Sequence, residues 1–178
     1  MKIINTILAM MMAIFSCSER CYLGAVEVQA HDEVQSAKCK VQNEEELAII
    51  TKAAERNNCR GEDFLILLAI RKAENGGPGR EFGIKHRLCR AAIDKRPADS
   101  LDIQAGWAAA TIVKNRHRWE EQTRDDRQQT IDDFINFLAD RYCPISVDAK
   151  GNENWKVNVK YFYEKSKRET KNNETNKI

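Results

Sequence analysis

The feature that most constrains the fold is a largely apolar helical segment that ends at a run of helix-breaking residues. Glu62 and Asp63 open a segment, Phe64 to Glu74, that is apolar on most faces. This pattern is typical of a helix buried at the centre of a domain. Residues 75–79, Asn-Gly-Gly-Pro-Gly, stop the helix abruptly. The sequence therefore predicts one buried central helix with a loop at its carboxyl end.

Four further segments carry apolar residues at helical spacing or helix-capping signals. They lie between the cap Asn43 and Asn57-Asn58, from the cap Ser100 to about Gln122, from a Thr130–Asp133 capping box to Pro144, and from Asn152 to Lys165. We find no convincing two-residue period and no internal repeat. The sequence predicts a mainly α class, with at most a small trimmed β-hairpin between Arg80 and Ala98.

Length and charge narrow the class of protein. A chain of 178 residues with 42% hydrophobic residues can build one core. A net charge of +2 argues against a strongly basic nucleic-acid binder, so we expect no nucleic-acid partner. No apolar run has the length of a membrane span. We expect a monomer without a transmembrane span.

The amino-terminal segment resembles an export signal. Lys2 precedes a nearly continuous apolar run over residues 3–15, which suits a signal peptide better than a span. We expect a signal peptide over residues 1–25, with cleavage after Ala25 or Ala30, and a periplasmic or secreted protein. A lipid anchor at Cys17 is the alternative.

The rest of the chain then divides into three parts. We expect a linker over residues 26–42, a folded domain over 43–165 and a disordered polar tail over 166–178. The chain has six cysteines, and export makes disulfides the expected state of those that remain after cleavage. Neither the cysteines nor the histidines have ligand spacing, so we expect no metal and no cofactor.

Glu74 is the residue whose chemistry stands out. It occupies the last helical turn, where the negative end of the helix dipole disfavours a carboxylate. Partial burial would also favour the protonated form, which a general acid needs to protonate a glycosidic oxygen. An exposed glutamate capped by a glycine-rich turn is the structural alternative.

Several motifs surround Glu74 in a consistent order. Glu74-Asn75 ends the apolar helix, Phe82-Gly83-Ile84 follows its loop, residues 102–107 open the next long helix, and aromatic residues mark the end of the domain. Taken together over residues 44–165, they resemble the lysozyme-like superfamily, in particular soluble lytic transglycosylases and goose-type lysozymes. Lys85 stands where that family carries a glutamine.

The resemblance implies a lysozyme-like fold and a polysaccharide substrate such as peptidoglycan. It implies that Glu74 acts as general acid and base, with Gly83, Gln104, Tyr142 and Trp155 as substrate-binding residues. In the transglycosylases one glutamate suffices, because the sugar's own 6-hydroxyl attacks. If a second carboxylate takes part, Glu81 is the nearest candidate in the chain.

Two interpretations from other classes remain open. One is a non-catalytic glycan-binding or structural protein on the same fold. The other is an interaction module that uses residues 80–118, where nine Lys and Arg face four Asp and Glu. A catalytic Glu74 should lie in an open cleft with apolar neighbours and have a raised pKa. A structural Glu74 would be ion-paired to Arg or Lys and have no cleft beside it.

Overall fold

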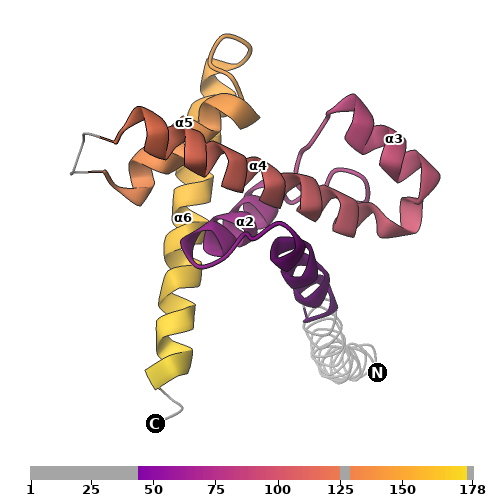
Figure 1. Ribbon diagram of the computed structural model, residues 1–178, viewed down its shortest axis with the longest axis horizontal. Helices are drawn as coiled ribbons and strands as arrows, with labels where there is room; N and C mark the ends of the chain where they lie inside the picture. The colour runs from indigo at the N-terminus through magenta and orange to yellow at the C-terminus, as the bar shows by residue number, and fades with distance from the viewer. Residues whose placement is uncertain (1–43, 125–128, 176–178) are drawn as a thin grey trace, which may run out of the picture. The chain divides into compact units, whose positions relative to one another are not determined.

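The computed structural model describes residues 44–124 and 129–175, and Glu46–Ile178 forms one compact unit. The expected signal peptide, the linker and Cys17 lie outside the described residues. The described part is mainly helical (Figure 1). No helix within it is long and apolar enough to cross a membrane.

The predicted central helix is α2, Glu62–Glu74. Its apolar face is buried, and the helix packs against both α4, Ser100–Gln122, and α6, Ala149–Thr175 (Figure 1). The fully buried residues of α2 are Ile66, Leu67, Ala69 and Ile70. A preceding helix over residues 44–56 also agrees with the sequence prediction.

The β-hairpin predicted between Arg80 and Ala98 is wrong. This stretch holds α3, Arg87–Lys95, and a 3-10 turn, Pro97–Asp99, and the described residues contain no strand. His86 caps α3 by accepting a hydrogen bond from the backbone N–H of Leu88 at 3.3 Å. Cys89 is the one buried residue of α3, so most of this short helix faces solvent.

The fourth predicted helix is confirmed as α5, Ile131–Tyr142. Thr130 and Asp133 form the predicted capping box, in which each side chain accepts from the other's backbone N–H. Ser100, in contrast, makes no cap for α4. The helix begins at Ser100, so Asp99 holds the cap position, and the Ser100 hydroxyl donates to Glu81 instead.

The last helix is longer than the sequence predicted. α6 begins before Asn152 and continues to Thr175, so residues 166–175 of the expected tail are helical. Ser166 is buried, and Glu169 lies 3.9 Å from Lys72 of α2. The start of the polar segment predicted to be disordered therefore lies beside α2. Residues 176–178 lie outside the described part.

Candidate functional site

Glu74 is the last residue of α2, and its neighbour Asn75 ends the helix in a left-handed conformation with φ 43°. The two cations of this turn pair elsewhere: Arg71 lies 2.6 Å from Glu46, and Lys72 pairs with Glu169. Within the described ranges, no cation lies within 4.0 Å of the Glu74 carboxylate. The carboxyl group therefore meets the negative helix end without a compensating charge.

Trp155 of α6 holds one oxygen of this carboxyl group. Its indole N–H donates to Glu74 Oε1 at 3.0 Å, and the side chain is buried. The indole also stacks on the ring of Tyr142, with 5.1 Å between the ring centroids and 24° between the planes. A contact across 81 residues of sequence thus fixes the orientation of Glu74.

Gly83 covers the other oxygen. A Cβ at this position would collide with the Glu74 carboxylate, most closely with Oε2, and the backbone adopts φ 66°. Both the space and the dihedral angle therefore require glycine. Since the indole N–H can only donate, Oε1 must act as acceptor. The proton of a neutral carboxyl group consequently sits on Oε2, beside the side-chain-free backbone of Gly83.

Tyr142 places a phenol in the same group. Its hydroxyl is buried and has no hydrogen-bond partner among the described residues. Burial raises the pKa of Tyr142, and the charges of Glu74 and Cys59 raise it further. The phenol therefore stays protonated and keeps an unused donor near Glu74.

Gln104 has a different function from the one implied by the resemblance. Its Oε1 accepts from the backbone N–H groups of Phe82 and Ile84, both at 3.2 Å. Its Nε2 donates to the carbonyls of Gly79 at 3.3 Å and Ile84 at 3.0 Å. The amide has no further capacity and is fully buried, so Gln104 clamps the loop that carries Gly83.

Glu81 lies apart from Glu74 in its contacts. It is buried, accepts from the Ser100 hydroxyl, and its Oε2 has no partner among the described residues. Its charge contributes, after burial, to a raised pKa of Cys89. Glu81 thus faces α3 and α4, whereas Glu74 faces α6.

The structure therefore brings together four of the six predicted site residues: Glu74, Gly83, Tyr142 and Trp155. Sequence reasoning missed Asn152, which is buried and donates to the Cys143 carbonyl at 2.7 Å and to Asp140 at 3.1 Å. These bonds tie the end of α5 to α6. A buried asparagine on a polar helix carries no sequence pattern that could have revealed it.

Cys143, next to Tyr142, links the group to the loop electrostatically. Burial raises the pKa of the Cys143 thiol, and the carboxylates of Asp148 and Glu74 add to this, while Lys85 lowers it. Cys143 is therefore within electrostatic reach of both Glu74 and Lys85. It is a free thiol, as are Cys59 and Cys89, so the expected disulfides do not join these three cysteines.

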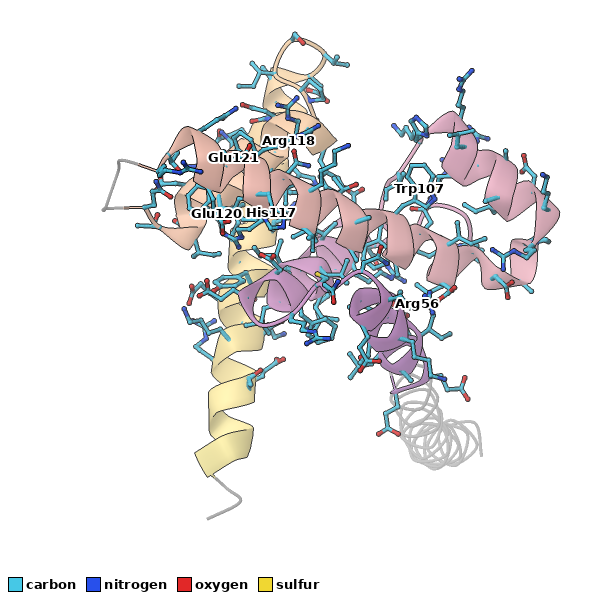
Figure 2. The ribbon with its side chains drawn as sticks, viewed as in Figure 1. Arg56, Trp107, His117, Arg118, Glu120 and Glu121 are labelled. Carbon is cyan, nitrogen blue, oxygen red and sulfur yellow. The ribbon has the colours of Figure 1, made fainter. Side chains whose placement is uncertain are left out.

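Two hollows are found in the described part of the chain, and Glu74 lines neither of them, so neither is the open cleft expected beside a catalytic Glu74. The smaller, of about 320 Å³, lies between the loop after Glu74 and α3. The larger, of about 640 Å³, includes Arg56 and Trp107 in its lining (Figure 2). Trp107 also stacks on His86, with 5.1 Å between the ring centroids.

Comparisons of the chain with protein-family models, with curated proteins and with solved structures found no match. The functional conclusion therefore depends on the residues and their geometry.

Proposed function

We propose that this protein is an exported glycosidase that cleaves β-1,4 linkages of an amino-sugar polymer such as peptidoglycan, on a lysozyme-like helical fold. One observation carries the proposal. The Glu74 carboxyl group has no cationic partner among the described residues, is oriented by the Trp155 N–H at 3.0 Å, and packs with Oε2 against the backbone of Gly83. The lack of a cationic partner and the fixed orientation favour a general acid over a surface ion pair.

The geometry suggests how the residues would act. The proton on Glu74 Oε2 passes to the glycosidic oxygen as the bond to the anomeric carbon breaks. The resulting carboxylate then takes a proton from the attacking hydroxyl group, either of water or of the sugar itself. The Trp155 N–H stabilises that carboxylate through its bond to Oε1. The Tyr142 ring stacks on the Trp155 indole and helps to hold that donor in place.

The position of Glu81 favours a mechanism with one carboxylate. Its contacts are Ser100 and the surroundings of Cys89, not the group around Glu74. A muramidase or lytic transglycosylase with Glu74 as both acid and base fits this arrangement. The apolar segment over residues 3–15 supports export, with a lipid anchor at Cys17 as the alternative.

A non-catalytic glycan-binding protein is the second candidate. The observation that favours it is the larger hollow, which is lined by Trp107 and not by Glu74. A half-buried tryptophan in an open hollow is suited to stacking on a sugar ring.

Digestion of purified peptidoglycan by the full chain tests the proposal. Glu74→Gln should abolish release of soluble fragments, whereas Glu164→Gln, an exposed position on α6, should not. Mass spectrometry of the fragments distinguishes anhydro ends, made by transglycosylation, from reducing ends, made by hydrolysis. If the folded wild type binds peptidoglycan but releases no fragments, the proposed glycosidase activity is refuted and the glycan-binding candidate is supported.

A further inference from the structure

The smaller hollow follows directly on the loop that covers Glu74. Gly83 touches the Glu74 carboxylate, and the next two residues, Ile84 and Lys85, line the hollow. Its remaining lining comes from the glycine-rich turn and from one side of α3: Pro78, Gly79, Arg80, Arg90, Ile93 and Asp94. A ligand that reaches Glu74 along this loop would therefore pass the hollow.

The lining carries an excess of positive charge. Arg80, Lys85 and Arg90 face a single acid, Asp94. In the described part of the chain, none of these three cations lies within 4.0 Å of a carboxylate, whereas Arg56, Arg71, Arg96 and Arg116 all do. Three cations around one concave surface attract an anion more strongly than three cations spread over a flat one.

The loop backbone that carries Arg80 and Lys85 is held in place. Gln104 bonds to the backbone of Gly79 and Ile84, on either side of Arg80 and next to Lys85. The Arg80 N–H also donates to the Gly77 carbonyl at 2.9 Å. Because the backbone is fixed, a ligand loses less free energy in ordering it on binding.

We propose that this hollow binds a free carboxylate on a short peptide branch of the glycan substrate. Guanidinium groups match the two oxygens of a carboxylate, and Ile84 and Ile93 supply apolar walls suited to small side chains beside it. The inference rests on the proposed function for its substrate, but the hollow can be tested without cleavage.

The first test compares two forms of the substrate. Peptidoglycan and the same glycan stripped of its peptides by an amidase are digested by the full chain. The wild type should cleave the peptide-bearing form about tenfold faster, in line with one or two charge-assisted hydrogen bonds. Arg90→Gln should bring the ratio of the two rates close to one. Arg87→Gln, on the same helix but outside the hollow, should leave the ratio unchanged.

The second test measures binding, so that a failure of the proposed function is distinguishable from a failure of this inference. The probe is a soluble disaccharide-peptide, with its carboxylates free or converted to amides, titrated calorimetrically into the full chain. The free form should bind at least about tenfold more tightly, and Arg80→Gln or Arg90→Gln, checked for folding by circular dichroism, should remove the difference. This result would support the hollow even if no glycan were cleaved.

Three outcomes would overturn the inference. They are equal binding of the free and amidated probes, an unchanged preference in both arginine variants, and tighter binding of inorganic phosphate than of the peptide probe. The last result would assign the hollow to a phosphate-bearing ligand instead.

Discussion

Replacing Gln104 with alanine, near the start of the long helix α4, should destabilise the protein. The side chain makes four hydrogen bonds to loop backbone, at 3.2, 3.2, 3.3 and 3.0 Å. Each such bond contributes about 1 kcal/mol net. Since these bonds are long and the loop can partly relax into contact with water, we expect a total loss of about 3 kcal/mol. That loss is a large fraction of the ~5–15 kcal/mol typical of a folded domain.

Urea unfolding, followed by circular dichroism and tryptophan fluorescence, measures this loss. The midpoint should fall while the m-value stays constant. Gln122→Ala, at the exposed end of the same helix, controls for the loss of a glutamine from α4 and should change the stability by less than about 0.5 kcal/mol. A loss below about 1 kcal/mol for Gln104→Ala would show that the amide does not clamp the loop, and the reasoning about the loop and its hollow would fail with it.

Three further predictions follow from single contacts. Gly83→Ala places a methyl group against the Glu74 carboxylate at φ 66°, so glycan cleavage should fall about 100-fold. In the control Gly77→Ala, the added methyl group meets nothing within 4 Å, and activity should be retained. Similar cleavage rates for both variants would contradict the assignment of Glu74 to the active site. The pKa of Asp133 is lowered, mainly by the hydrogen bond from the Thr130 side chain, so its stabilising effect should be present above about pH 4 and should diminish as the pH falls further. Asp133→Asn should therefore lower the unfolding temperature more at pH 6 than at pH 2.5, and an equal effect at both would refute the assignment. Burial raises the pKa of Cys59 to about 12, so Cys59 should resist iodoacetamide at pH 8 in the native protein and react in urea. Peptide mass spectrometry measures the labelling. Rapid labelling of the native protein would contradict the burial of Cys59.

The sequence predicted most helices because their signals are local. Thr130 and Asp133 interact over three residues, and the run after Glu74 stops α2 within one turn. It did not predict α3, whose segment is rich in arginine and buries one residue fully. Nor did it predict the helical end of α6, where Ser166 is buried and Glu169 lies near Lys72 of α2, a helix far away in the sequence.

The sequence by itself determined where most helices lie and that Glu74 ends the buried central helix. The spacing of apolar residues, the helix caps and the helix-breaking residues all act within about four residues. The tertiary structure alone decided what surrounds that glutamate. Trp155 reaches Glu74 across 81 residues, and Gln104 reaches the loop across 20 to 25. Such contacts depend on how the helices pack. Gln104, which was predicted to bind substrate, bonds to the loop backbone, and part of the basic stretch over residues 80–118 lines the smaller hollow.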